Sequence, residues 1–399
     1  MSKLARYTKL ILQNRSTKRQ AGGPDKSLWL IAERGTDAED NGIALFYYLL
    51  EHSELGIHPK YLLSHNSVNY NEVVRRIAEI VPYEEPSSYI VEPGSEENFN
   101  LLYHAGALIS THTYGFTPDM VAYHNLARYN LFKPKGAMVF LQHGINDKVE
   151  LWINWSQFKP DVFVVSTKME QLATHRALGV PNFAIQNVGL CRYDRLHQAL
   201  ENHEGKNGYV LIMPTWRQWL TGLTDEEFID TNFFLSWNEL LVNRSFLATM
   251  KEYNLKPVFY LHPELQKFRH LFQKNDKVIF ADSNVQDWII KSNMMITDFS
   301  SVYFDEAYME KPVVFYQFDR SRYTAGHYSA LLVQHTYFGP VRTTADEVAA
   351  VTKEILDGQM PPRDESYVRN FYSWHDGDQC KRTVQAIQSA VRSKELQRW

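Results

Sequence analysis

Residues 294–316 read MMITDFSSVYFDEAYMEKPVVFY, a stretch that contains a complete strand, helix and strand. The apolar runs Met294 to Thr297 and Val313 to Tyr316 are unbroken rather than alternating, which is typical of parallel strands buried on both faces. Between them, Val302 to Glu310 has the length and apolar spacing of a helix. We therefore expect a parallel βαβ unit whose helix begins near two serines.

The same alternation of short apolar runs and helical segments extends from Ser27 through the rest of the chain. Further strands are expected at residues 28–32, 61–64, 107–110, 138–142, 162–166, 209–213 and 257–261, with a strand-like stretch at 183–188. Further helices are expected at residues 43–51, 71–80, 168–178, 236–253, 344–356 and 378–394. The pattern predicts an α/β protein of doubly wound, Rossmann-like sheets.

A polar segment, Asn202 to Gly208, contains two glycines and lacks periodicity, so it is the best candidate for a linker. We expect a basic arm at residues 1–26, a first domain at 27–202, a second at 208–372, and a C-terminal helix at 373–399 that packs back towards the first domain. Two such domains facing each other would place the carboxyl ends of both sheets around a central cleft, where these folds bind ligands.

Composition excludes several classes of protein. At about 150 residues per domain, 399 residues make two or three domains, and 44% hydrophobic content excludes a disordered chain, a coiled coil and a disulfide-stapled scaffold. The net charge of −4 gives no basic excess, so no nucleic-acid partner is expected. With two cysteines, no apolar leader and no long apolar span, we expect a cytoplasmic protein.

The arm at residues 1–26 is strongly basic, with Asp25 as its single acid. Its apolar residues recur at helical spacing among the cations; they are Leu4, Tyr7, Ile11 and Leu12. This arm fits peripheral attachment to the inner face of an anionic membrane, and it fits equally well a solvated basic segment.

The common cofactor motifs are absent from the sequence: there is no GxGxxG after the first strand, no Walker A, no HExxH and no CxxC. No acidic cluster demands a metal. We therefore expect no metal site and no required cofactor, and leave dependence on Mg²⁺ open. Candidate functional residues must be sought at strand ends.

Two histidines follow predicted strands. His143 comes after the apolar run 137–141, beside a glycine, Gly144, that lets a ligand approach the backbone, so it lies where a general base is expected. His262 follows the strand at 257–261 and is directed into a loop by Pro263. The alternative for each is a structural histidine.

Two further strand ends favour binding of an anion. Arg217, after the strand at 209–213, suits bidentate contact with phosphate, or else it caps a helix or pairs with an acid. Ser300 and Ser301 offer hydroxyls and backbone N–H groups at a helix start, an arrangement that serves both capping and phosphate binding. Taken alone, Lys311 reads as a helix C-cap and Asp319 as a turn residue.

An ordered set of short motifs between about residues 100 and 360 resembles the CDP-glycerol glycerophosphotransferase family, which includes teichoic acid primases, polymerases and related capsule enzymes. The motifs are Gln142-His143-Gly144, Gly189-Leu190-Cys191-Arg192-Tyr193-Asp194, Pro214-Thr215-Trp216-Arg217, His262-Pro263, Thr297-Asp298-Phe299-Ser300-Ser301 with Asp305, and Lys311-Pro312 with Tyr316 and Asp319. The stretch from Glu33-Arg34-Gly35 to Asp40-Asn41-Gly42 also looks like the opening of capsule-type members. From the residues alone, the second motif reads as a turn held by an Arg192–Asp194 pair.

The resemblance implies a GT-B-like fold and transfer of a polyol phosphate from CDP-glycerol or CDP-ribitol to a hydroxyl of a lipid-linked glycan or growing polymer, with release of CMP. It implies that His143 is the general base. It places the donor phosphates on Arg217, His262, Ser300 and Ser301. Further donor-site positions that it suggests are Thr297, Asp298, Asp305, Lys311 and Asp319.

The chain departs from the family pattern at two positions. Gln142 stands where many members have Trp, and Cys191 where many have Pro. Gln142 and Gly144 would lie on the acceptor side, so the first departure bears on the acceptor more than on the reaction.

Two other functions remain as alternatives. The same fold occurs in GT-B glycosyltransferases, which use a nucleotide sugar as donor. A chain of this fold could also be a non-catalytic, membrane-associated subunit of an envelope-polymer assembly, although such a subunit needs no base.

Overall fold

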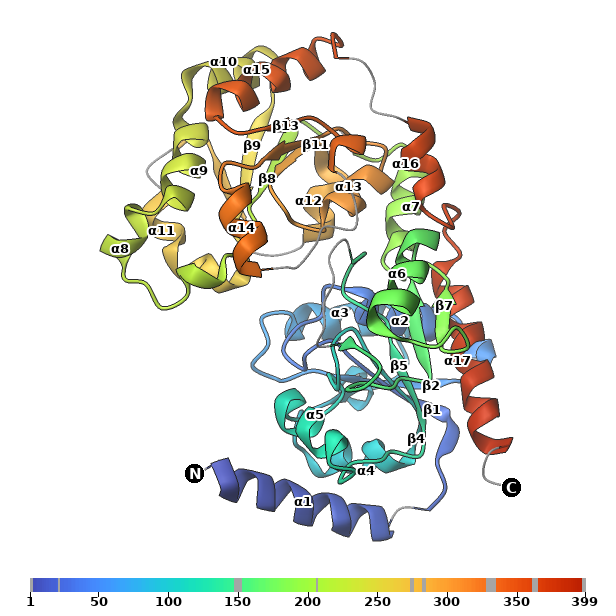
Figure 1. The fold of residues 1–399 in the computed structure, drawn as a ribbon. Coiled ribbons are helices and arrows are strands. Elements are labelled where there is room, and N and C mark those ends of the chain that lie inside the picture. The colour runs from blue at the N-terminus through green and yellow to red at the C-terminus, as the bar shows by residue number, and fades with distance from the viewer. Residues whose placement is uncertain are drawn as a thin grey trace. The chain divides into compact units, whose positions relative to one another are not determined.

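The structure is a computed structural model, shown in Figure 1. It describes residues 3–20, 22–146, 153–205, 207–272, 276–281, 285–327, 335–360 and 365–396. The chain divides into two compact units. Unit 1 is Met1–Ile145, Glu150–Asp194 and Asp376–Trp399, and unit 2 is Asn146–Val149 and Arg195–His375. The main division thus falls upstream of the polar segment 202–208.

Unit 1 contains a parallel sheet with strand order β3-β2-β1-β4-β5-β6-β7. The strands are β1 (Asp25–Ala32), β2 (His58–Leu62), β3 (Ile90–Val91), β4 (Ala105–Ser110), β5 (Ala137–Phe140), β6 (Val162–Val165) and β7 (Ile185–Asn187). The order reverses between β1 and β4, and every residue of β4 is buried, as expected of a central parallel strand covered on both faces.

The helices of unit 1 cover both faces of this sheet. They are α1 (Lys3–Gln20), α2 (Asn41–Glu51), α3 (Tyr70–Ile80), α4 (Glu96–His104), α5 (Met120–Arg128), α6 (Lys168–Leu178) and α17 (Gln379–Leu396). Residues of α2, α3 and α17 form one apolar core with β1, β4, β5 and β6. Helix α4 contacts β1 and β4 and also packs against α1.

Unit 2 repeats this architecture with strand order β10-β9-β8-β11-β12-β13, again all parallel. The strands are β8 (Tyr209–Met213), β9 (Lys256–Tyr260), β10 (Ile279–Ala281), β11 (Ser292–Thr297), β12 (Val313–Tyr316) and β13 (Val341–Arg342). Here the order reverses between β8 and β11, so loops that bind a ligand are expected after these strands.

The helices of unit 2 are α8 (Asp225–Ile229), α9 (Asn232–Val242), α10 (Arg244–Glu252), α11 (Arg269–Phe272), α12 (Val285–Lys291), α13 (Tyr303–Tyr308), α14 (Arg320–His327), α15 (Ala345–Leu356) and α16 (Glu365–Phe371). Helix α7 (Tyr193–Glu201) begins at the division between the units. An apolar core joins α9, α10 and α15 to the sheet, while α12 and α13 contact β11.

The predicted class, α/β with two Rossmann-like parallel sheets, is confirmed. The predicted helix at 236–253 is two helices, because Asn243 has extended backbone angles and its side chain accepts the N–H of Phe246 to cap α10. Sequence reasoning missed β3, β10 and β13. Each is an edge strand of two or three residues, too short to show an apolar run.

The basic arm forms helix α1 and packs on unit 1 through a polar seam. Asn14 is buried, and its Oδ1 accepts hydrogen bonds from the hydroxyls of Tyr103 and Tyr123, both at 3.1 Å. Tyr7 accepts a bond from Asn125, so this face of α1 is turned to the protein. Among the described residues, no helix combines the length and apolar content needed to cross a bilayer.

Candidate functional site

Three loops of unit 2 meet at the carboxyl edge of its sheet. They follow β8, β11 and β12, which are neighbours in the strand order. Thr215 and Arg217 lie after β8, Asp298 after β11 and Asp319 after β12. Parallel strands place their carboxyl ends on one edge, so residues distant in sequence come into contact there.

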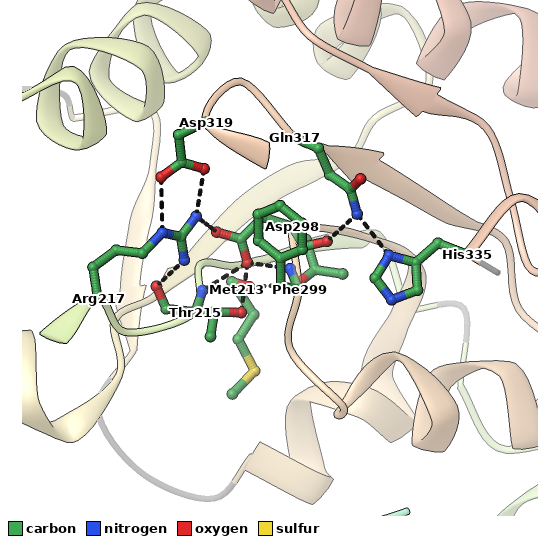
Figure 2. A network of polar contacts seen from close by, with 9 residues as sticks. Met213, Thr215, Arg217, Asp298, Phe299, Gln317, Asp319 and His335 are labelled. Carbon is green, nitrogen blue, oxygen red and sulfur yellow. Dashed lines mark hydrogen bonds and ion pairs between the residues drawn. The ribbon is translucent and has the colours of Figure 1, made fainter. Parts of the chain in front are cut away.

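Arg217 ties these three loops together (Figure 2). Its Nε and Nη2 donate to the two oxygens of Asp319, each at 2.9 Å. Nη2 also donates to Oδ2 of Asp298 at 2.8 Å, and Nη1 donates to the carbonyl of Thr215 at 2.8 Å. Arg217 is wholly inaccessible to solvent, with an exposed fraction of 0%.

The surroundings of Arg217 keep it charged. Burial would lower the pKa of this guanidinium, but the adjacent carboxylates of Asp298 and Asp319 outweigh it and raise the pKa above its ordinary value. The rings of Tyr323 and Phe299 lie 4.6 and 5.2 Å from its central carbon. Four of its five N–H groups are hydrogen-bonded to the protein and the side chain is wholly buried, so Arg217 can reach a phosphate only if the surrounding loops move. Its phosphate contact stays a prediction.

Asp298 is the centre of the wider network in Figure 2. Its Oδ1 accepts the N–H and the hydroxyl of Thr215, at 2.8 and 2.6 Å, and the N–H of Phe299 at 2.6 Å. Its backbone carbonyl accepts Nε2 of Gln317 at 2.8 Å, and Gln317 in turn contacts Nδ1 of His335 at 2.6 Å. These hydrogen bonds join the loops after β8, β11 and β12 into one network.

His262 lies after β9, on the same edge. Its Nδ1 accepts the N–H of Glu264 at 3.3 Å. A neutral imidazole that accepts at Nδ1 carries its proton on Nε2, so Nε2 can donate to an anion. The ring of Trp216 lies 6.3 Å from the imidazole, with an angle of 28° between the two planes. The geometry is compatible with the predicted phosphate contact.

The serines precede α13 without capping it. The N-cap residue of α13 is Val302, and no side chain caps the helix with a hydrogen bond at this position. The expectation that Ser300 or Ser301 is the N-cap was therefore wrong. Ser300 Oγ accepts the N–H of Val302 at 3.4 Å, and both serines are partly exposed after β11. Their hydroxyls remain candidates for phosphate binding.

The other predicted donor positions in unit 2 are buried. Thr297 donates its hydroxyl to the carbonyl of Met213 at 2.6 Å, and Asp305 is enclosed in α13. Lys311 precedes β12, whereas Asp319 follows it, so Lys311 lies at the opposite edge of the sheet. There its buried Nζ donates to the carbonyls of Ile289 and Ile290 at the end of α12, whereas a surface cap on the preceding helix was expected. The structure does not bring Lys311 to the site.

A cavity of about 410 Å³ adjoins Asp319 on this edge. Its lining includes Trp219, Arg320 and Arg322, and the guanidinium of Arg322 lies 4.6 Å from the Trp219 ring. Because Arg320 and Arg322 are exposed cations, the cavity favours an anionic ligand. Sequence reasoning did not select these two arginines, since a charged pair at a helix start is usually a solvated face.

On unit 1, His143 follows β5 and is exposed at the carboxyl edge of the sheet. Its ring stacks on that of His112, with centroids 5.0 Å apart and planes 15° apart. His112 follows β4, the neighbour of β5, and its Nδ1 lies 2.9 Å from the hydroxyl of Thr111. Burial, with help from His143 and Arg34, lowers the pKa of His112 to about 2. Sequence reasoning missed His112, although it follows an apolar run as His143 does.

The side chain of Gln142 points into the protein. It is buried, with Nε2 donating to the carbonyl of Val164 at 2.5 Å and to Glu170 at 3.1 Å. The expectation that Gln142 lines the acceptor side therefore needs correction, because its amide anchors the loop to β6 and α6. Gly144 is buried beside it. Gln142 has φ of 59°, a left-handed conformation that costs about 1–2 kcal/mol outside glycine.

The expected pair between Arg192 and Asp194 is not formed. Arg192 instead donates to Asp40, with Nη1 and Oδ1 2.6 Å apart. Asp194 accepts the N–H groups of Gln379 and Cys380, and thereby holds the start of α17. The described residues contain no group of three His, Cys, Asp or Glu side chains arranged to hold a metal ion.

The chain is similar in sequence to a curated protein of teichoic acid synthesis. GgaB, the minor teichoic acid biosynthesis protein of Bacillus subtilis (strain 168), is 30% identical over 388 residues, which cover 91% of this chain. The chain spans 40% of the length of that relative.

Solved structures share the GT-B-like fold. The wall teichoic acid polymerase TagF superposes with a TM-score of 0.68 at 14% identity, covering 98% of this chain and 97% of that chain. A putative UDP-N-acetylglucosamine 2-epimerase from Listeria monocytogenes gives 0.55 at 13% identity, covering 92% and 98%. At these identities the likeness concerns the fold alone.

The sequence model of one family matches residues 16–389, a range that contains both sheets and every strand-end loop described above. That family is described as CDP-glycerol:poly(glycerophosphate) glycerophosphotransferase, in agreement with the resemblance read from the motifs. The chain therefore belongs to the CDP-glycerol:poly(glycerophosphate) glycerophosphotransferase family.

Proposed function

We propose that this chain transfers a polyol phosphate from a CDP-activated donor to an acceptor hydroxyl and releases CMP. The family makes glycerol phosphate the first candidate, with ribitol phosphate as the second. The acceptor is a lipid-linked glycan or a growing polymer in teichoic acid or capsule synthesis. The observation that carries the proposal is the strand-end location of the family's motifs. An exposed histidine lies at the carboxyl edge of the sheet of unit 1, and a cavity lined by the exposed cations Arg320 and Arg322 lies at the carboxyl edge of the sheet of unit 2.

In this scheme, unit 1 supplies the base. His143 takes the proton of the acceptor hydroxyl as its oxygen attacks the phosphorus that carries the polyol. A new P–O bond forms to the acceptor, and the P–O bond to the CMP phosphate breaks in line with it. General-base assistance of this kind contributes about 10² to 10⁴-fold to the rate.

Unit 2 holds the donor. Nε2 of His262 and the hydroxyls of Ser300 and Ser301 contact the phosphates and stabilise the charge that develops on the leaving CMP. Arg217 and Asp298 keep these loops in place, so little reorganisation is needed when the donor binds. No protein-bound cofactor enters the scheme, and transfer measured with EDTA against added Mg²⁺ tests whether a metal arrives with the donor.

A donor screen tests the proposal. The chain is incubated with a lipid-linked glycan acceptor and with CDP-glycerol, CDP-ribitol, UDP-sugars or CMP-sugars in turn, and the released nucleotide is quantified. We expect CMP release from a CDP-polyol. Turnover of a nucleotide sugar with both CDP-polyols untouched would contradict the proposal and favour a glycosyltransferase.

The base is tested in the same assay. His143→Ala should lower turnover by about 10²-fold or more while the dissociation constant for CDP-glycerol stays within about twofold. His65→Ala is the matched control, because His65 is also an exposed histidine that follows a strand of unit 1, and it pairs with Glu92. Equal turnover in the two variants would remove His143 from the reaction.

A further inference from the structure

Side chains from two distant segments hold the backbone on both sides of the base. Nδ2 of Asn41 donates to the carbonyl of Gln142 at 2.9 Å. Nη1 of Arg192 donates to the carbonyl of His143 itself, also at 2.9 Å. Asn41 begins α2 after β1, and Arg192 precedes α7, so neither belongs to the loop that it holds.

The two holding residues are themselves tied together. The backbone N–H of Arg192 donates to Oδ1 of Asn41 at 3.1 Å, and Nη1 of Arg192 pairs with Asp40. Asp40 is fixed as the N-cap of α2, and its own N–H donates to the buried carboxyl of Glu33 at 2.8 Å. Asn41 has an exposed fraction of 0% and Arg192 of 7%, so water does not compete for these bonds.

The loop that they hold has a strained backbone, because Gln142 adopts a left-handed conformation that persists only where its surroundings enforce it. His143 directly follows Gln142 in the sequence. The direction of its ring therefore depends on two carbonyl groups being kept where Asn41 and Arg192 place them.

We propose that Asn41 and Arg192 are positioning residues for His143, acting on its backbone and not on the substrate. The inference rests on the proposed role of His143 as general base. It gives a role to the Asp40-Asn41-Gly42 and Cys191-Arg192 motifs, which the proposed reaction does not use. Reacting groups misplaced by about 1 Å commonly lose about 10²-fold in rate, so a loosened loop should show in turnover.

Two conservative variants test the inference. Asn41→Asp is isosteric and keeps an acceptor for Arg192, but it removes the N–H donated to Gln142. Arg192→Lys keeps a positive charge for Asp40, but it loses the planar group that reaches two partners. We expect kcat to fall about tenfold or more in each, with the dissociation constant of CDP-glycerol, measured by calorimetry, within about twofold.

The matched control is Asp194→Asn. It alters a half-buried carboxylate two residues from Arg192, and the hydrogen-bond partners of this carboxylate are in α17. Its kcat should stay within about twofold. A fall in the control as large as in the two variants would indicate general loss of structure and would overturn the inference.

A double-variant cycle separates positioning from stability. If Arg192 acts through His143, Arg192→Lys should change kcat by less than about twofold when His143 is already Ala. An equal fall in both backgrounds overturns the positioning role. If kcat falls severely in His143→Ala but stays normal in Asn41→Asp and Arg192→Lys, the positioning inference is overturned and the proposed function is not. Absence of CMP release by the unsubstituted chain overturns the proposed function and this inference with it.

Discussion

At the scale of single residues, the two stacked histidines of unit 1 have different environments. His143 is exposed, whereas His112 is largely enclosed between the ends of β4 and β5 and faces His143 and Arg34. An imidazole so placed cannot take a proton at neutral pH, because a second positive charge near Arg34 would be poorly solvated. His112 therefore presents a neutral ring to the base.

The pKa of His112 predicts how stability depends on pH. Its pKa is about 2 in the folded chain and near 6.5 when unfolded, so between these values the unfolded state binds more protons and stability falls as pH falls. From pH 7 to pH 5 this one site should remove about 1–2 kcal/mol. His112→Phe keeps a stacked ring but cannot titrate.

The measurement is urea unfolding of both chains at pH 5, 6 and 7. The unsubstituted chain should lose about 1–2 kcal/mol more than His112→Phe over this range. Other titrating groups are common to both chains and cancel in the difference. Parallel pH profiles would show that folding does not lower the pKa of His112.

At the scale of elements, Arg217 binds together the loops that follow β8, β11 and β12. A buried ion pair adds little to stability over apolar groups of similar size, but removal of one partner leaves a buried charge without compensation. Here one guanidinium compensates two buried carboxylates, Asp298 and Asp319. Its removal should therefore disturb three loops at once.

Arg217→Met should destabilise the chain by about 3–5 kcal/mol in urea unfolding and weaken CDP-glycerol binding in calorimetry. Arg369→Met is the matched control in unit 2, because Arg369 pairs with Glu310 on the exposed face of α16 and should cost under about 1 kcal/mol. Similar losses of unfolding free energy in the two variants would show that the buried Arg217 network stabilises the chain no more than the exposed pair of Arg369 and Glu310.

At the scale of the whole molecule, helix α1 has two different faces. Asn14 and Thr17 are buried against the protein, whereas Lys9, Arg15 and Lys18 are exposed. Tyr7 and Ile11 are half-buried, whereas Leu12 is 60% exposed among the cations, so attraction to a membrane through α1 would be mainly electrostatic, with an apolar contribution from Leu12. We propose that this basic face contacts anionic lipid.

Lys9→Gln with Arg15→Gln should weaken sedimentation with vesicles containing anionic lipid by about tenfold or more, since each cation near the surface contributes about 1 kcal/mol. Lys251→Gln with Lys256→Gln removes the same charge from exposed sites in unit 2 and is the control. Neutral vesicles should bind neither chain. Undiminished binding of the α1 variant to anionic vesicles would place the contact elsewhere.

The fold class and the residues at the strand ends were predictable from sequence because the signals are local. Strands β8 and β12 were predicted to the residue, since each is an unbroken apolar run closed by a polar residue or a proline. Carboxyl ends of parallel strands share an edge, so His143, Arg217, His262 and Asp298 could be assigned to sheet edges without coordinates.

The partners of these residues could be found only in the tertiary structure. Arg217 pairs with residues 81 and 102 positions away, and Arg192 pairs with Asp40, 152 positions away, and not with the nearby Asp194. Periodicity identifies an element and its buried face, but it carries no information on which distant loop lies beside another. Spatial adjacency follows from strand order, and strand order decided that Arg217 is enclosed by the loops after β11 and β12 and that His143 stacks on His112.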